Sequence, residues 1–419
     1  MSAPTSTPLA SRSALAFIFT TMLIDTIGLG IIIPVTPAII RQLTGQSLSG
    51  AADWGGWLMF VYALMQFLCA PAIGNLSDRF GRRPVLILSL VALAIDYAIT
   101  GWAPSIAWLF LGRFLSGIAG AAYPTANAYI ADVSPPEKRA ANFGLVGAAF
   151  GIGFVVGPAI GGIIGDAWGP RAPFFVAAGF AAANALFGVV VLKESLPPER
   201  RRTFELWRAN PAGSLRALRR FPMILGLLGV TVLMRLAHDA NPATWTYYTM
   251  LRFHWTAAQV GYSLMAVGAL TAFSFGVLPR LVVPRIGETR AVYVGLFCAG
   301  IGYFGYAISS QPWMLYAWMT VWTLGGVGGP ALNAIMSRSV PANEQGELMG
   351  ALASAGSITS IVAPLLLTHL FAYFTSGRAP FYFPGVSFAA AALFELLGLA
   401  MFVSLQPRLA TRPAGASQT

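Results

Sequence analysis

The stretch LAFIFTTMLIDTIGLGIII (residues 15–33) is apolar along its whole length except for a few polar side chains, of which only Asp25 is charged. A helix of about 20 apolar residues crosses the roughly 30 Å hydrocarbon core of a bilayer, so this stretch predicts a transmembrane helix. No small-residue cleavage site follows it, and the apolar region of a secretory signal would not normally hold an aspartate. We therefore expect the segment to be retained as a first helix.

Further apolar runs of roughly the same length follow along the chain. They lie near residues 54–73, 85–103, 106–128, 142–166, 172–192, 222–248, 257–279, 291–309, 312–336, 347–373 and 386–405. Since a chain in lipid must satisfy its own backbone hydrogen bonds, long uninterrupted apolar runs predict helices rather than alternating strands. The sequence therefore predicts an all-α membrane protein with twelve transmembrane helices.

Composition excludes a soluble protein. The 419 residues are 56% hydrophobic and only 10% charged, with a mean hydropathy of +0.68. Charged residues normally make up about a quarter of a soluble globule. The net charge of +11 comes from basic residues that are spread between apolar runs. No concentrated basic domain is present, so we expect no nucleic-acid partner.

The distribution of lysine and arginine predicts the topology. Twenty of the 26 basic residues fall on one side if the even-numbered loops and both ends share that side, and the other side receives Arg41, Arg171, Arg252 and Arg378. Cytoplasmic loops carry the excess of basic residues, so both termini are predicted to be cytoplasmic. The segment 193–221, the only long charged stretch, is predicted to be a cytoplasmic loop with an amphipathic piece at the membrane surface.

This central loop divides the helices six and six. The expected domains are an N-terminal six-helix bundle (1–192), the cytoplasmic central loop (193–221), a C-terminal six-helix bundle (222–405) and a cytoplasmic tail (406–419).

An internal repeat supports the division. A shift of 206 residues places Gly81 on Gly287, Tyr97 on Tyr303, Pro124 on Pro330, Asn127 on Asn333, Pro135 on Pro341, Gly144 on Gly350 and Pro158 on Pro364. An even number of helices keeps the two halves parallel in the membrane. Parallel six-helix repeats are typical of transporters that bind substrate where the repeats meet, near the bilayer midplane.

Three spaced motifs resemble a known family. They are GNLSDRFGRRP (74–84), GRFLSG (112–117) and GIGFVVGPAIGG (151–162), and they resemble the signature loop, the helix 4 arginine motif and the antiporter motif of the major facilitator superfamily. MLIDTIGLGIIIPV (22–35), YALMQ (62–66), SDRFGRRPVL (77–86) and IDY (95–97) are similar to the bacterial tetracycline/proton antiporters in particular. The resemblance implies the major facilitator fold, with two pseudo-symmetric bundles.

Residues at the cytoplasmic side are candidates for gating. Gly74 and Gly81 lie where the chain must turn tightly or another helix must approach. Asp78 is expected to lie level with the start of the eleventh helix near Gly346 and to cap it. The resemblance implies that Arg82 and Asp132 complete a charge triad with Asp78 that latches this side. The alternative is a solvated loop that only sets topology.

The gating set also includes the fifth helix, where glycines remove bulk and a proline removes one backbone donor. We expect close packing against a neighbour and a local bend; packing alone is the alternative to a hinge or seal. The full predicted set is Gly74, Asp78, Arg79, Gly81, Arg82, Arg83, Asp132, Gly153, Gly157, Pro158, Gly161 and Gly162.

Charges inside the apolar runs predict proton coupling, because such residues are costly in lipid and are usually functional. Asp25, Asp96 and Arg113 lie near one level when depth is counted at 1.5 Å per residue. Burial raises a carboxyl group's affinity for a proton, and a nearby guanidinium lowers it. The approach of Arg113 would therefore make the carboxyl group release a proton, and its withdrawal would let the carboxyl group bind one. The alternative is that the two acids are structural.

Candidate substrate-binding residues lie in both halves. Arg235, His238 and Asp239 occupy one face of the seventh helix just before Asn241 and Pro242 interrupt it. They form either one wall of a pocket or an intrahelical Arg235–Asp239 pair. The full predicted set is Tyr62, Gln66, Tyr123, Asn127, Arg235, His238, Asp239, Asn241 and Asn333. Glu395 has no evident partner and is expected to be structural or to face lipid.

The sequence thus predicts a proton-coupled antiporter of a bacterial inner membrane that exports a small amphiphilic, drug-like molecule, with tetracycline-like compounds among the candidates. The alternatives are a facilitator or importer of a sugar or other metabolite, and a membrane protein that binds a ligand without moving it. Catalytic carboxylate pairs, nucleophile elbows, metal-ligand clusters and phosphate loops are absent from the sequence, so an enzyme, a metal and a cofactor are not expected. The expected partners are the substrate, protons and lipid, around a monomer.

Overall fold

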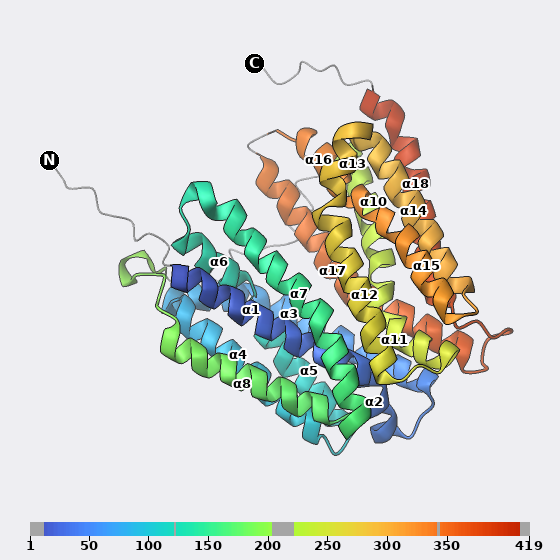
Figure 1. Cartoon of the computed structure of the whole chain (residues 1–419). Coiled ribbons are helices and arrows are strands. Elements are labelled where there is room, and N and C mark those ends of the chain that lie inside the picture. The colour runs from blue at the N-terminus through green and yellow to red at the C-terminus, as the bar shows by residue number, and fades with distance from the viewer. Residues whose placement is uncertain (1–11, 121–122, 203–221, 342–343, 411–419) are drawn as a thin grey trace. The chain divides into compact units, whose positions relative to one another are not determined.

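A computed structural model describes residues 12–120, 123–202, 222–341 and 344–410 (Figure 1). All regular secondary structure in these ranges is helical. In chain order the helices are α1 (Arg12–Ile32), α2 (Thr36–Thr44), α3 (Leu48–Phe80), α4 (Arg82–Trp102), α5 (Ile106–Gly120), α6 (Tyr123–Val133), α7 (Arg139–Trp168), α8 (Ala172–Val191), α10 (Pro222–His238), α11 (Ala240–Phe253), α12 (Ala257–Gly276), α13 (Leu278–Ile286), α14 (Glu288–Ile308), α15 (Pro312–Thr323), α16 (Gly328–Arg338), α17 (Gln345–Thr375) and α18 (Val386–Ala410).

The helices confirm the predicted membrane-spanning segments. Eleven helical segments within the described ranges are long and apolar enough to cross a membrane. The remaining predicted span, 312–336, is also helical, but a 3-10 turn at Leu324–Val327 divides it into α15 and α16. The turn falls in a glycine-rich run, where Gly325 packs so closely on α14 that a Cβ would lie 2.8 Å from the Ala299 Cβ.

The described chain forms two compact units. The first comprises residues 1–45, 61–209 and 256–268, and the second comprises residues 46–60, 210–255 and 269–419. Helix α3 therefore contributes its first residues to the second unit and the rest to the first. Helix α12 contributes its first residues to the first unit and its last to the second.

The first unit is built on the packing of α1 against α7 and of α4 against α8, with α1 also contacting α8 (Figure 1). Its buried apolar cluster includes Ile18, Tyr129 and Ala149, which are at most 2% exposed. In the second unit α14 and α10 both pack against α18, and α14 also packs against α15 and α16. The larger cluster of this unit includes Leu227, Leu296 and Phe402, all fully buried.

The internal repeat is visible in the helices themselves. Helices α4 and α14 each contain 21 residues, and their first residues, Arg82 and Glu288, differ by the same 206 positions as the sequence repeat. A glycine with positive φ precedes each of them, Gly81 at +104° and Gly287 at +80°. Both halves thus use the same turn, which only glycine adopts without strain.

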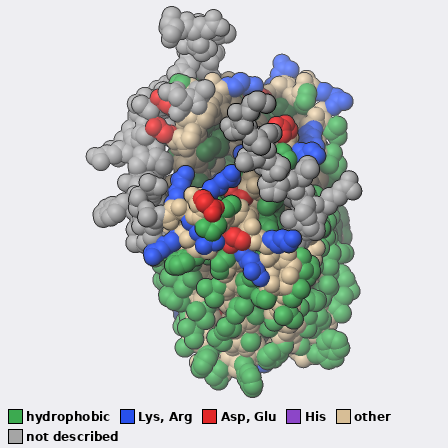
Figure 2. Space-filling view, turned by 90° about the vertical axis from the view of Figure 1, so that its left-hand side faces the viewer, with side chains coloured by type: hydrophobic (Ala, Val, Ile, Leu, Met, Phe, Trp, Pro, Cys, Tyr) green, Lys and Arg blue, Asp and Glu red, His purple; other side chains and the backbone are tan. Residues whose placement is uncertain are grey.

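Large apolar side chains cover much of the surface. Figure 2 shows them over most of one face, with Lys, Arg, Asp and Glu gathered toward one end of it. Leu88 is 69% exposed, Val190 is 76% exposed and Trp102 is 79% exposed. A soluble monomer rarely exposes contiguous apolar area on this scale, so this surface fits contact with lipid.

Candidate functional site

A buried ion pair lies within the first unit. The Arg113 guanidinium on α5 lies 3.1 Å from the Asp96 carboxylate on α4, and the Asp96 side chain is fully buried. The Thr100 hydroxyl, one turn further along α4, donates to the other Asp96 oxygen at 3.3 Å. Gly112 makes room for this contact, because a Cβ there would lie 2.7 Å from the Thr100 hydroxyl. The predicted proximity of Asp96 and Arg113 is confirmed.

Asp25 lies on α1 beside this pair. It makes no hydrogen bond or ion pair with any residue that the structure describes. Asp25, Asp96 and Arg113 all lie near the hydroxyls of Tyr62 and Tyr97. The Tyr97 ring packs across the α1 backbone at Gly28, 3.4 Å from the position a Cβ would take. Of these two acids, Asp96 therefore has a cationic partner, and Asp25 has none among the described residues.

Two predicted substrate-binding residues lie at the crossing of α3 and α5. The Gln66 amide donates to the Tyr62 hydroxyl at 3.5 Å and to the Gly120 carbonyl at 3.3 Å. The helices approach closely here, since a Cβ at Gly117 would lie 2.6 Å from the Tyr62 carbonyl. On α6, Asn127 is half-buried, and the side chain of Tyr123 lies outside the described residues.

The charge triad predicted at the end of α3 is confirmed in its geometry. Arg82 lies 2.6 Å from Asp78 and 3.3 Å from Asp132, and it donates to the Ser77 hydroxyl at 2.9 Å. The guanidinium thus joins the end of α3 to the end of α6. The expected contact of Asp78 with the start of α17 involves both units and stays a prediction.

The motif around this triad is less loop-like than expected. Helix α3 continues to Phe80, and α4 begins at Arg82, so Gly81 alone makes the turn. Gly74 lies inside α3 and makes no turn, and a Cβ there would meet no described atom within 4 Å; its place in the gating set stays a prediction. Arg83 donates to the Val189 carbonyl at 2.7 Å. Arg79 stacks over the Phe80 ring at 5.1 Å.

Glu194 caps α4, a role that no motif in the sequence indicated. Gly81, the residue before the helix, has no side chain to cap it, and the Glu194 carboxylate takes that place. It accepts backbone hydrogen bonds from Arg82 at 2.8 Å and Arg83 at 3.3 Å, and also from Ser195 and Leu196, both at 3.0 Å. Free N–H groups at a helix start and the helix dipole both favour an anion here. The start of the central loop is thereby fixed to the triad.

The glycines of α7 allow the close packing that the sequence predicts. A Cβ at Gly153 would lie 2.7 Å from the Thr26 Cβ, and one at Gly157 would lie 2.9 Å from the Gly30 Cα. Gly161 packs even more tightly on the Ile31 backbone. Gly162 instead faces Ala257 and Ala258 at the start of α12. Pro158 lies inside α7 without interrupting it.

The start of α12 is capped by an acid from α7 that the sequence did not single out. The Asp166 carboxylate accepts hydrogen bonds from the backbone of Ala257 at 3.1 Å and Ala258 at 3.0 Å. Thr256 and Gln259 complete the cap, because each side chain bonds the other residue's backbone N–H. This reciprocal arrangement is a capping box.

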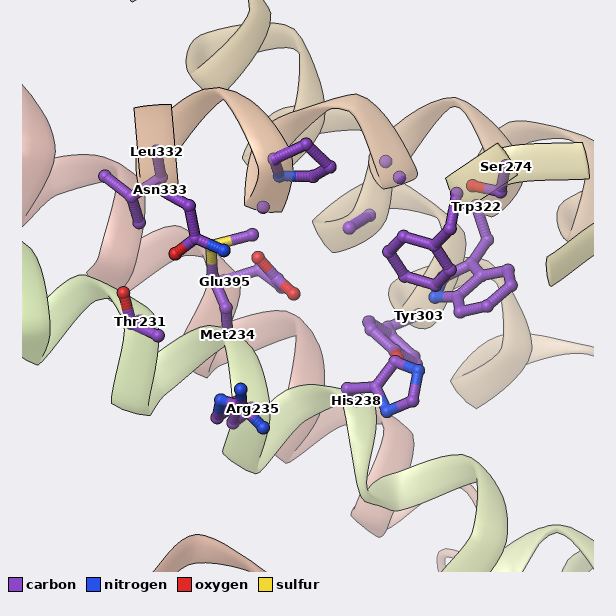
Figure 3. Close-up of a pocket in the computed structure, with 16 residues that line it drawn as sticks. Thr231, Met234, Arg235, His238, Ser274, Tyr303, Trp322, Leu332, Asn333 and Glu395 are labelled. Atoms are coloured by element: carbon purple, nitrogen blue, oxygen red, sulfur yellow. The ribbon is translucent and has the colours of Figure 1, made fainter. Parts of the chain in front are cut away.

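The second unit contains a cavity of about 390 Å³ (Figure 3). Residues of α10, α12, α14, α16 and α18 and of the turn before α16 line it, together with Trp322 of α15. Polar and aromatic side chains among them are Arg235, His238, Tyr303, Trp322, Asn333 and Glu395. The volume and the mixture of apolar walls with few polar groups are typical of a small-molecule site.

The seventh predicted helix breaks where the sequence indicates. Helix α10 ends at His238 and α11 begins at Ala240, so Asn241 and Pro242 fall in the first turn of α11, where proline is tolerated. Arg235 and His238 line the cavity, whereas Asp239 does not. The alternative of an Arg235–Asp239 ion pair is wrong, because neither residue forms it among the described contacts.

Two further predictions have different outcomes. Asn333 lines the cavity from α16, as its place in the predicted set requires. Asn241 is buried away from it, with a side-chain oxygen that no described group bonds. For Glu395 the expectation of a lipid-facing position is wrong, because the residue is 4% exposed and lines the cavity; the alternative of a structural role stays a prediction.

These features define first a class of protein. Helices apolar enough to cross a membrane, ionisable groups buried among them and a ligand-sized cavity describe a multi-pass membrane transporter rather than an enzyme. Sequence comparison then gives the family. The chain matches the Major Facilitator Superfamily over residues 18–364 and belongs to it.

Relatives and a solved structure agree with this assignment. The tetracycline resistance protein, class C, of Escherichia coli is 40% identical over 362 residues, which cover 86% of this chain and 90% of that protein. The class G protein of Vibrio anguillarum is 38% identical over 355 residues, covering 83% and 88%. A bacterial homolog of the human lysosomal transporter Spinster, inward-facing and unoccupied, has a TM-score of 0.78 at 19% identity, covering 98% of this chain and all of that one. The last likeness shows the fold.

Proposed function

We propose that this protein is a proton-coupled antiporter that exports a small amphiphilic molecule by alternating access, with tetracycline-like drugs as its substrates. The observation that carries the proposal is the group of membrane charges in the first unit. Asp96 is paired with Arg113, while Asp25 has no partner among the described residues. An acid without a fixed partner, beside a guanidinium that can change partner, can bind and release a proton while the protein stays folded. The relatives named for tetracycline resistance support the substrate class.

In this mechanism Asp25 carries the proton. When Asp25 gains or loses its charge, the Arg113 guanidinium returns to Asp96 or moves away from it. The triad of Asp78, Arg82 and Asp132 opens and closes the cytoplasmic side. The proposed substrate-binding residues are Tyr62, Gln66, Asn127, Arg235, His238 and Asn333, with Tyr123, Asp239 and Asn241 retained as predictions from the sequence.

We further propose that the protein lies in a bacterial inner membrane as a monomer with cytoplasmic termini, and that the N-terminal bundle, central loop, C-terminal bundle and tail have the bounds predicted from the sequence. With this orientation, protons fall inward while substrate leaves. One proton crossing about 100 mV and one pH unit releases roughly 2.3 and 1.4 kcal/mol, enough for about a 500-fold gradient of a neutral substrate.

The test is uptake of labelled tetracycline into inside-out membrane vesicles under an imposed pH gradient. The wild-type protein should accumulate the drug, and an ionophore that collapses the gradient should abolish accumulation. Asp25→Asn keeps the volume of the side chain but fixes it neutral, so accumulation should fail while exchange between equal pools continues. Asp25→Glu, matched for expression, should restore part of the accumulation.

Three outcomes contradict the proposal. Near-normal accumulation by Asp25→Asn would rule out this residue as the obligatory proton carrier. Transport that ignores the pH gradient would indicate a facilitator. Binding without any movement across the membrane would indicate a protein that does not transport.

A further inference from the structure

Among the described residues, Glu395 is the one acidic side chain that lines the cavity of the second unit. It projects from α18 and is only 4% exposed, and its Oε2 atom is buried without a hydrogen-bond partner among the described residues. In Figure 3 its carboxyl group points into the cavity, between Met234 and Asn333 on one side and Tyr303 and Trp322 on the other. A buried acid that has no partner among the described residues, inside a ligand-sized cavity, is suited to bind a proton or a positively charged group of a ligand.

The neighbouring helices do not supply that partner. On α14, Gly300 faces Glu395 with no side chain, and a Cβ there would lie 3.4 Å from the Glu395 Cβ, so this position offers Glu395 no polar group. The titratable or charged groups that face this region are Tyr303 on α14, Arg235 and His238 on α10, and Asp239 just after α10. None of them bonds or pairs with Glu395 in the described structure. The Arg235 guanidinium lies instead against α17 at Gly356.

An ionised carboxylate in such a place is costly unless it is neutralised or paired. A proton removes the charge, and a positively charged group of a ligand would pair with it. The aromatic rings of Trp322 and Tyr303 favour the second partner when a ligand is present, because the faces of such rings attract cations. A proton and a ligand cation therefore compete for one carboxyl group.

We propose that Glu395 holds a proton in the empty cavity and exchanges it for the protonated amine of an aromatic amphiphile, which it then binds directly. The proton passes from the carboxyl group to water, and the amine's positive charge takes its place. This inference rests on the proposed export function, to which it adds the charge of the substrate and the residue that recognises it. It places proton exchange in the second unit as well as at Asp25.

The test compares tetracycline with dedimethylamino-tetracycline, the analogue that lacks the amine, on the full-length protein in lipid nanodiscs. Wild-type protein should bind tetracycline at least about tenfold more tightly, as expected for a charge-assisted contact. Tetracycline binding in a weakly buffered solution should also release more protons than analogue binding. In Glu395→Gln both differences should disappear, while affinity for the analogue stays within about twofold of wild type.

Glu199→Gln is the matched control, since it removes a carboxylate from an exposed position in the short 3-10 helix Pro198–Arg200, away from the cavity, and it should keep both differences. Equal binding of the two drugs by wild type overturns the inference, and this result does not depend on any variant folding. A Glu395→Gln protein that keeps the amine preference also overturns it. Proton-driven uptake by wild-type vesicles without an amine preference would refute the Glu395 inference alone, whereas absence of uptake would refute the proposed function.

Discussion

The ion pair between Asp96 and Arg113 gives the sharpest test of how charge is held in the first unit. Arg113→Met removes the guanidinium and keeps most of the apolar stem. Asp96 is fully buried and would keep the hydrogen bond from the Thr100 hydroxyl but lose its cationic partner. Removing one partner of a buried pair typically costs about 3–5 kcal/mol. Since the Thr100 bond remains, we expect a loss of about 3 kcal/mol in the free energy of unfolding.

The double variant Asp96→Asn/Arg113→Met removes the unpaired charge as well. It should recover about 2 kcal/mol of the loss, a coupling energy within the usual range for residues in contact. Unfolding in mixed detergent micelles, with expression-matched protein, measures both values. The recovered protein should still fail to accumulate drug in inside-out vesicles, because the proposed mechanism needs Arg113. Equal destabilisation of the single and double variants would refute the role assigned to this pair.

Two further predictions concern the caps. Glu194→Gln should lower the free energy of unfolding by about 1–2 kcal/mol, because four backbone N–H groups lose a charged acceptor, whereas the exposed Glu199→Gln should change it by less than about 0.5 kcal/mol. Asp166→Ala should cost a similar 1–2 kcal/mol, as loss of a helix cap usually does. Thermal unfolding in detergent measures both changes. A Glu194→Gln effect no larger than that of Glu199→Gln would contradict a stabilising role of the Glu194 cap. An Asp166→Ala protein as stable as wild type would contradict the same role for Asp166.

Hydropathy predicted the fold well because lipid imposes one dominant constraint. Every span must be apolar and must satisfy its own backbone, so composition alone locates the helices. It did not predict where helices end. Helix α3 continues as far as Phe80 although its last turns are polar, because the end of a membrane helix is not required to coincide with the end of its apolar run.

The candidate site was predicted in part. The charges of the first unit were found because an ionisable residue within an apolar run is conspicuous. Glu194 and Asp166 were missed because each binds backbone N–H groups about ninety or more positions away, and backbone donors leave no trace in side-chain identity. These contacts were not predicted because their partners are far apart in the sequence, and not because the hydrogen bonds are weak.

The prediction that Glu395 faces lipid was wrong for a different reason. In a soluble helix the apolar period shows which face is inside. Helix α18 is apolar on all sides, since lipid and protein interior are both apolar, so no period indicates which way a single acid points. Only packing against α14 and α10 places Glu395 inward.

The repeat preserves the scaffold and changes the chemistry. At the 206-residue offset Tyr97 corresponds to Tyr303, and both side chains are buried. Asp25, Asp96 and Arg113, by contrast, correspond to Thr231, Gly302 and Met319, so the second half has lost every charge of the first-half group. A duplicated scaffold with one set of charges cannot bind protons in the same way in both units. The carboxyl group of the second unit comes from a different helix, α18, and it faces a cavity instead of an arginine. This difference is the physical reason to expect the first unit to respond to protons and the second to bind substrate in competition with them.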